Sequence, residues 1–242
     1  MGIIIRDNIE QYMKELKKWL EETVDADLEE MGDFFTVRID DYEKHMSIWE
    51  KAYQRMAELI PPECSRLLDL GCGTGLELDA IWKKHSNIEV TGVDLCQSML
   101  EQLGRKHSDK ALTVVCEDYF HYDMGMDTWE AVVSFESLHH FLPEQKRRLY
   151  TRIFKALKDG GMFILGDYIA CCEEEEEILR NAYLEKRKKS GIPDEKFVHF
   201  DIPLTLEHET ELLKMAGFSN IDVPDSIQGA TIICAKKQGK HI

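Results

Sequence analysis

The chain has 242 residues, of which 43% are hydrophobic and 31% are charged, and its formal net charge is −16. This length and composition fit one α/β domain with an appendage, and no apolar run approaches the ~20 residues that span a bilayer. The seven cysteines lack C-x-x-C spacing, which favours reduced thiols in a cytoplasmic protein over a disulfide framework or a zinc site. We therefore expect no membrane partner and no metal.

The acidic charge also argues against nucleic acid as a partner. Proteins that bind nucleic acid need a basic stripe that displaces counterions from phosphates. The one dense basic run here, at 186–189, closes a helical pattern that begins with five glutamates. Acids at the start of a helix and bases at its end complement the helix dipole, so we interpret this run as the solvated end of a helix.

The first part of the chain predicts a helical appendage. Apolar side chains recur at helical spacing over 7–22, and an acidic connector covers 21–33. After Phe34 and Phe35, a second helical pattern runs through Trp49, Ala52, Tyr53, Met56 and Ile60 and ends at Pro61. Two amphipathic helices are too few to bury a core of their own. We therefore expect residues 1–60 to act as a lid on a main domain formed by residues 61–242.

Strand and helix patterns alternate from there on, which predicts a parallel sheet with helices on both faces. Strands are expected near 66–70, 88–93, 112–116, 130–135 and 161–167, and helices near 75–84, 97–106, 144–157, 173–190 and 205–216. Two last strands, near 219–224 and 229–236, predict a closing antiparallel hairpin. The expected fold class is a doubly wound, mostly parallel α/β sheet.

The stretch from Leu67 to Gly75 carries the clearest functional signal. An apolar run reaches Asp69 and breaks into alternating glycines, and the next strand ends at Asp94. Glycines allow a tight turn and close approach to a ligand, while a carboxylate at the second strand tip can accept both ribose hydroxyls. The third glycine arrives one residue too early for the dinucleotide pattern G-x-G-x-x-G. Asp69 would repel a pyrophosphate and suits a cationic ligand, which argues against a nicotinamide or flavin site.

The string D-L-G-C-G-T-G at 69–75, followed by G-V-D-L at 92–95, resembles the nucleotide site of class I S-adenosylmethionine-dependent methyltransferases. The resemblance is specific over 64–168. It implies S-adenosylmethionine as the cofactor, S-adenosylhomocysteine as its product, and a seven-stranded sheet of order 3-2-1-4-5-7-6 with strand seven reversed.

The resemblance also implies a set of cofactor-binding residues. Asp94 is expected to hold the ribose, Asp118 the adenine amino group, and Asp69 the methionine amino group or the loop itself. The remaining members of the predicted set are Gly71, Cys72, Gly73, Leu95, Met99, Tyr119 and Phe135. The segment 34–42 resembles an N-terminal motif of the family, so Tyr42 and Arg38 are expected near the methionine carboxylate, Arg38 alternatively near an anionic substrate. An aromatic cluster that merely packs is the alternative.

The fourth strand runs into V-V-S-F-E-S-L-H-H-F at 132–141. The chain lacks the N-P-P-Y tetrad of relatives that methylate amides and adenine, and resembles small-molecule enzymes instead. His139, His140 and His199 are the predicted catalytic residues, with Glu136 and Asp167 as further candidate bases. Either histidine of the pair has a structural alternative, as a helix cap or a loop brace. We expect at most one of the pair to face the acceptor, because neighbours in an extended segment diverge.

The sequence thus predicts methyl transfer to a small molecule by a monomer or homodimer. Three alternatives stay open: a relative that binds the cofactor without catalysis, a tRNA or protein methyltransferase, and a nicotinamide oxidoreductase. The accepting atom is also open among nitrogen, oxygen, sulfur and carbon.

Overall fold

The computed structural model describes residues 8–193 and 195–239. Seven strands form one sheet of order β3-β2-β1-β4-β5-β7-β6. Their bounds are β1 Arg66–Leu70, β2 Glu89–Asp94, β3 Leu112–Cys116, β4 Trp129–Phe135, β5 Leu157–Tyr168, β6 Asn220–Ile227 and β7 Ala230–Lys236. The first five pair in parallel, and β7 runs antiparallel to both β5 and β6. The predicted sheet order and reversed strand seven are confirmed.

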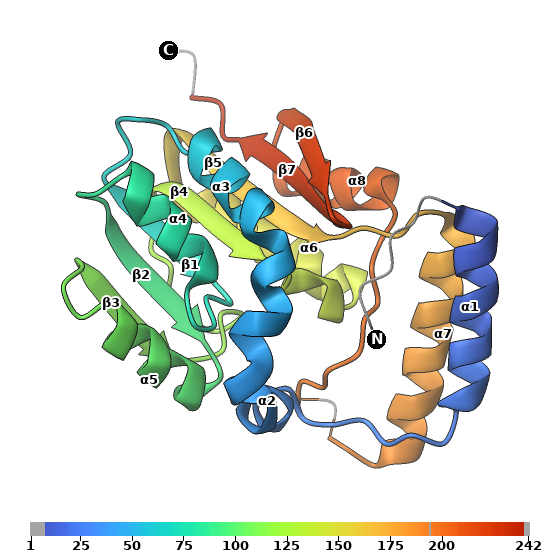
Figure 1. Ribbon diagram of the computed structural model, residues 1–242. Coiled ribbons are helices and arrows are strands. Elements are labelled where there is room, and N and C mark those ends of the chain that lie inside the picture. Colours follow the sequence, from blue (N-terminus) through green and yellow to red (C-terminus); the bar gives the residue numbers. More distant parts are fainter. Residues whose placement is uncertain (1–7, 194, 240–242) are drawn as a thin grey trace.

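Helices cover both faces of this sheet (Figure 1). Their bounds are α1 Ile9–Glu22, α2 Met31–Met46, α3 Glu50–Leu59, α4 Leu76–Lys84, α5 Gln97–Lys106, α6 Pro143–Ala156, α7 Glu173–Ser190 and α8 Leu206–Ala216, with short 3-10 helices η1 Ser47–Trp49 and η2 Leu138–His140. One core packs α3, α4 and α5 on the sheet, and a second packs α6 and α8 on the opposite face. Both cores are built from the alternating inward residues of buried strands.

A third apolar cluster lies away from the sheet, where α1 packs along α7 (Figure 1). Tyr12, Met13 and Leu16 of α1 are buried there, together with residues of the segment 198–202. Lys186 was predicted on a solvated helix end, but it is buried and donates to the carbonyl of Ala26 at 2.8 Å. The buried ammonium ties α7 to the chain that follows α1, because three backbone carbonyls accept from it.

Three local predictions differ from the structure. Helix α2 begins at Met31, inside the stretch expected to be an acidic connector, and η1 separates it from α3. Strand β5 begins at Leu157 and not near 161 as expected, because Leu157 pairs with Trp129 across an irregularity in the ladder. Strand β6 continues through Pro224 to Ile227, with a register shift between Asp222 and Asp225, and an edge strand tolerates proline at such a bulge.

All seven cysteines are free, as expected for reduced thiols. The Sγ atoms of neighbouring Cys171 and Cys172 are 3.9 Å apart and unbonded. Within residues 8–193 and 195–239, none of the helices combines the length and the apolar character needed to cross a membrane.

Candidate active site

The carboxyl ends of β1, β2, β3 and β4 meet at one edge of the sheet, where ligands of open α/β sheets bind. A groove at this edge, here the glycine-loop groove, is lined by nine of the residues predicted to bind the cofactor. These are Tyr42, Gly71, Gly73, Asp94, Leu95, Met99, Asp118, Tyr119 and Phe135. They come from four strand ends, α2 and α5, so the fold brings together residues that the sequence spreads over almost a hundred positions.

The loop after β1 requires glycine at more than one position. Gly71 and Gly73 have φ angles of 80° and 48°, in the left-handed region that favours glycine. A Cβ atom on Gly71 would lie 2.2 Å from Oγ of Ser137, closer than any real contact. The loop therefore keeps its backbone exposed to the groove only while this position stays glycine.

Asp94 fixes this loop from the tip of β2. Its Oδ2 accepts from the amide of Gly73 at 2.9 Å and its Oδ1 accepts from the amide of Cys96 at 2.8 Å. Burial raises the pKa of Asp94, and the amide donors oppose that rise. A carboxylate oxygen has two lone pairs, so each oxygen retains capacity for a ligand hydroxyl.

Asp118 and Tyr119 occupy the end of β3. Oδ1 of Asp118 accepts from the amide of Phe120 at 2.7 Å, and its Oδ2 lies 2.6 Å from Nδ1 of His121. The hydroxyl of Tyr119 lies 3.1 Å from Oγ of Ser137, which follows β4. Both side chains are thus held in place by short local contacts at the rim of the groove.

Two predicted cofactor residues, Asp69 and Cys72, are buried behind the loop and do not line the groove. Both carboxyl oxygens of Asp69 lack a hydrogen-bond partner within the described parts of the chain. Burial and the neighbouring Glu77 raise the pKa of Asp69, and burial raises the pKa of Glu77 to about 7. Asp69 and Glu77 thus form a buried pair of acids beneath the glycine loop.

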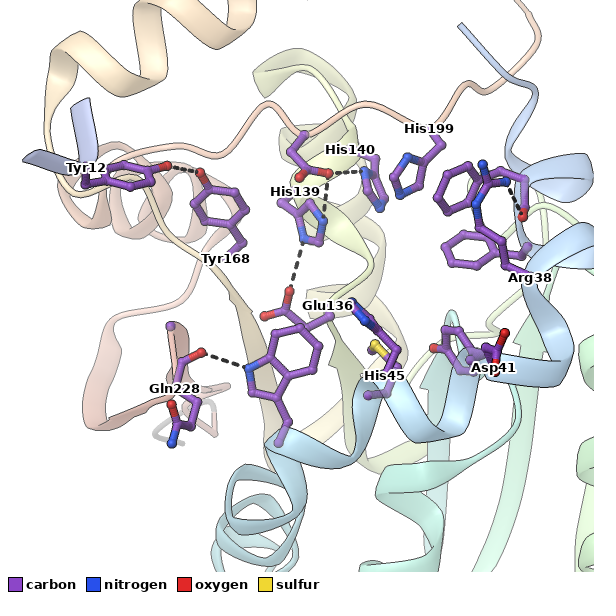
Figure 2. A pocket seen from close by; sticks show the side chains of 17 residues that line it. Tyr12, Arg38, Asp41, His45, Glu136, His139, His140, Tyr168, His199 and Gln228 are labelled. Atoms are coloured by element: carbon purple, nitrogen blue, oxygen red, sulfur yellow. Dashed lines mark hydrogen bonds and ion pairs between the residues drawn. The ribbon is translucent and has the colours of Figure 1, made fainter. Parts of the chain in front are cut away.

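A larger cavity of about 420 Å³ adjoins the groove, and we call it the histidine cavity (Figure 2). It lies between α2, η2, the end of β5 and the segment before α8. Its lining is aromatic and ionisable, and comprises Tyr12, Phe34, Phe35, Arg38, Asp41, Tyr42, His45, Met46, Trp49, Glu136, His139, His140, Tyr168, His199, Asp201, Gln228 and Gly229. Phe35, Tyr42, Glu136 and His140 line both spaces. The groove and the cavity therefore meet at these four side chains.

Three predicted catalytic histidines gather along one wall of this cavity, as Figure 2 shows. The ring centroids of His139 and His140 are 4.0 Å apart, and those of His140 and His199 are 4.7 Å apart. Both members of the pair line the cavity, whereas the sequence predicted at most one. The reason is local: η2 is a 3-10 turn, whose neighbouring side chains diverge less than those of an extended strand.

The histidines differ in their electrostatic surroundings. Burial lowers the pKa of His139, but Asp167, 2.6 Å from its Nδ1, and Asp201, 3.5 Å from its Nε2, outweigh burial and hold that pKa well above its ordinary value. Burial and the neighbouring imidazoles hold the pKa of His140 well below its ordinary value, and burial lowers the pKa of His199 to about 4. His140 and His199 are therefore neutral bases near pH 7, while His139 is the charged member.

Arg38 lies at the cavity and not at the groove. Its guanidinium makes two bonds to the carboxylate of Glu29, at 2.9 and 3.1 Å, and donates to the carbonyl of Phe34 at 3.0 Å. It also lies 3.7 Å from the centre of the Phe34 ring, which in turn stacks on the ring of His199. Its charge is therefore already paired inside the protein.

Sequence reasoning did not single out several cavity residues. Tyr12, Trp49, Tyr168 and Gln228 come from four distant parts of the chain, and no motif joins them. Asp201 follows the predicted His199 by two residues, but nothing in the sequence indicated that it lies beside the histidine pair, where its Oδ1 is 3.4 Å from Nδ1 of His140.

Two sets of side chains in this wall have the spacing of metal ligands, although the sequence predicted no metal. His139, His140 and Asp201 form one set, and Glu136, His139 and Asp167 form the other, with ligand atoms within 4.8 Å of one another. Nδ1 of His139 is engaged by Asp167, and Nδ1 of His140 lies 3.2 Å from the carbonyl of Phe200. Hydrogen bonds within the protein thus compete for the nitrogens that a metal ion would use.

Part of the chain is similar to a known protein family and to named relatives. Residues 67–161 match the methyltransferase domain family. A carboxy-S-adenosyl-L-methionine synthase from Nautilia profundicola is 26% identical over 170 residues, which cover 65% of this chain and 71% of that protein.

Solved structures share the architecture. A candidate O-methyltransferase from Nostoc punctiforme matches with a TM-score of 0.62 and 22% identity, over 81% of this chain and 59% of that one. Human N-acetylserotonin methyltransferase, solved in complex with S-adenosylmethionine, matches with a TM-score of 0.59 and 17% identity, over 80% of this chain and 52% of that one. The chain spans less than two thirds of both structures, and at these identities the likeness establishes the fold alone.

Proposed function

This chain carries a methyltransferase domain of the class I fold, and we propose that it transfers a methyl group from S-adenosylmethionine to a small molecule. One observation carries the proposal: the glycine-loop groove and the histidine cavity meet at four shared side chains. A cofactor in the groove would face an acceptor in the cavity across Glu136 and His140. When bound, the cofactor supplies a methyl group activated by a positively charged sulfur.

The groove fits this cofactor in three respects. The glycine loop leaves room for close backbone approach, since a Cβ on Gly71 would meet Ser137. Asp94 keeps lone pairs for ribose hydroxyls, and Asp118 stands where the resemblance expects the adenine amino group. Asp69 and Glu77 lie buried beneath the loop, and their pKa values are raised. A nearby cation would stabilise their charged forms and be stabilised in turn, whereas a pyrophosphate would disfavour those forms.

The cavity supports catalysis by position and by proton transfer. Methyl transfer is an in-line displacement, so a fixed acceptor supplies much of the rate. Nδ1 of His140 faces the carbonyl of Phe200 at 3.2 Å, which leaves the other ring nitrogen of a neutral imidazole to take a proton. The carboxylates of Asp167 and Asp201 pair with the two ring nitrogens of the neighbouring His139. We assign His140 as the general base. His139 and His199 lie beside its ring and help to hold it in place.

Thermal unfolding tests the cofactor assignment. S-adenosylmethionine and S-adenosylhomocysteine should raise the Tm, and NAD, NADP and FAD should leave it unchanged, because a ligand stabilises the state that it binds. A shift with NADH and none with S-adenosylhomocysteine would contradict the assignment.

A single-turnover reaction tests the chemistry. Methyl-labelled cofactor is incubated with the protein and a cell extract divided into small molecules, RNA and protein, and label should appear in the small molecules. Label in RNA or protein would favour the other methyltransferase classes, and cofactor binding without label transfer would favour a non-catalytic role. The relatives named carboxy-S-adenosyl-L-methionine synthase add a further outcome, a carboxylated cofactor, which mass spectrometry separates from S-adenosylhomocysteine.

A further inference from the structure

Glu136 occupies the junction of the two spaces in an unusual backbone conformation. It directly follows β4 and has a φ of 46°, one of three non-glycine residues with positive φ in the described chain. Its amide donates to the carbonyl of Gly166 at 2.8 Å, which holds the strained turn. A non-glycine residue in this region is strained, because its Cβ crowds the backbone. Such strain is retained where the position of a side chain matters, and here it delivers a carboxylate, with 9% of its surface exposed, to both the groove and the cavity.

The fixed charges of the cavity are predominantly negative. Asp41, Glu136 and Asp201 contribute carboxylates to its lining, and the lining includes no lysine within the described residues. Arg38 is the one guanidinium there, and Glu29 already pairs with it through two hydrogen bonds. His139 is the other cation of the lining, and Asp167 and Asp201 already pair with its two ring nitrogens. A carboxylate or phosphate in this cavity would therefore meet only cations that are already paired, whereas an ammonium group would meet Glu136, whose Oε2 lies 3.9 Å from Nδ1 of His139.

The remaining walls suit a cation as well. Tyr12, Phe35, Tyr42, Trp49 and Tyr168 present aromatic rings to the cavity. Several are fixed in place: Nε1 of Trp49 donates to the carbonyl of Gln228 at 3.1 Å, and the hydroxyls of Tyr12 and Tyr168 are 2.8 Å apart. Aromatic faces attract ammonium groups, and they do so most strongly where water is excluded.

We propose that the methyl acceptor is a small cationic amine, whose ammonium group is bound by Glu136 among the aromatic rings of the histidine cavity. This inference rests on the proposed function and names its substrate class. A cavity of about 420 Å³ accommodates a molecule of one or two rings.

The chemistry of such an acceptor also uses the neighbouring base. An ammonium nitrogen has no lone pair, so one proton must leave before it can attack. That proton passes to the neutral ring of His140, the nitrogen lone pair forms the N–C bond, and the C–S bond breaks with its electron pair returning to sulfur. Burial and neighbouring imidazoles keep the pKa of His140 low, so its ring is neutral and ready to accept the proton near pH 7.

Three matched probes test the substrate class by calorimetry on the protein saturated with S-adenosylhomocysteine. Phenethylamine, 2-phenylethanol and phenylacetate share one ring and differ in charge. We expect phenethylamine to bind at least about tenfold more tightly than the alcohol, which corresponds to about 1.4 kcal/mol, and phenylacetate to bind most weakly. Equal binding of all three, or tightest binding of phenylacetate, would overturn the inference, while the Tm shift with S-adenosylhomocysteine would still support the cofactor assignment.

Two variants test whether Glu136 causes the preference for the amine. Glu136→Gln should bring the amine to within about twofold of the alcohol while S-adenosylhomocysteine still binds, and the surface control Glu144→Gln should keep the preference for the amine. Weaker cofactor binding with an unchanged preference would assign Glu136 to the cofactor and overturn the inference. The wild-type probes are repeated after treatment with EDTA. Loss of amine binding there would mean that a metal ion occupies the wall, and this result would equally overturn it.

Discussion

Asp94 offers the sharpest test of the cofactor site, through the substitution Asp94→Asn. The carboxylate accepts from two backbone amides, at 2.8 and 2.9 Å, and faces the groove with its remaining lone pairs. Asparagine keeps one acceptor oxygen but turns the other into a donor and removes the charge. A hydrogen bond to a charged group contributes about 1.5–3 kcal/mol, so affinity for S-adenosylhomocysteine should fall about tenfold to 150-fold. Alanine is a poorer choice, because it would orphan the amides of Gly73 and Cys96.

Calorimetry with S-adenosylhomocysteine measures this loss, and the Tm of the free protein reports whether the fold survives. The control is Asp109→Asn, since the Asp109 side chain is 73% exposed and pairs with Lys110 away from the groove. The control should bind like the wild type. If Asp94→Asn is folded and also binds within about twofold of the wild type, the ribose does not lie at the tip of β2 and the orientation proposed for the cofactor is wrong.

Three further outcomes are expected. Gly71→Ala should abolish cofactor binding, because the new Cβ would lie 2.2 Å from Oγ of Ser137 at a φ of 80°. In the control Gly104→Ala, the new Cβ has nothing within 4 Å, so the free energy of unfolding in denaturant should rise by about 0.5–1 kcal/mol. Turnover followed against pH should hold below the ordinary histidine pKa of about 6.5, because the pKa of His140 is lowered and its ring stays neutral further into acid; an acid limb at or above that value contradicts His140 as the base. Proteolysis within 21–33 should slow when S-adenosylhomocysteine is added, and equal cleavage rates with and without it would remove the proposed lid.

The sheet and the cofactor groove were predictable because their signals are local. Each strand is a short apolar run bounded by a turn, and the glycine loop with Asp94 occupies consecutive strand ends. In a parallel sheet those ends lie on one edge whatever the intervening helices do. The strand order and register therefore suffice to predict where the residues of such a motif lie. Asp69 and Cys72 are the exceptions, because a motif position does not specify which side of the loop a side chain faces.

The histidine cavity was not predictable in the same way. Its walls come from α1, α2, η1, η2, the end of β5, the segment before α8 and the turn between β6 and β7. Residues as far apart as Tyr12 and Gln228 share no periodicity or spacing that sequence analysis reads. Helix α2 was not predicted as a helix of its own. Phe35, Tyr42 and Met46 recur in it at helical spacing, but none of its residues is buried in a core.

That exposure gives α2 a specific place in the proposed lid. Helix α3 buries four residues in the core of the sheet, and α1 buries three against α7 and its surroundings. Helix α2 buries none, yet its Phe35 and Tyr42 line both the groove and the cavity. A ligand that orders α2 from the groove side would therefore also complete the cavity wall. Binding of the two ligands should then be coupled, so phenethylamine should bind more tightly when S-adenosylhomocysteine is present, and by linkage the cofactor product should bind more tightly with the amine. Equal affinities in both calorimetric titrations would mean that α2 is already in place before either ligand arrives.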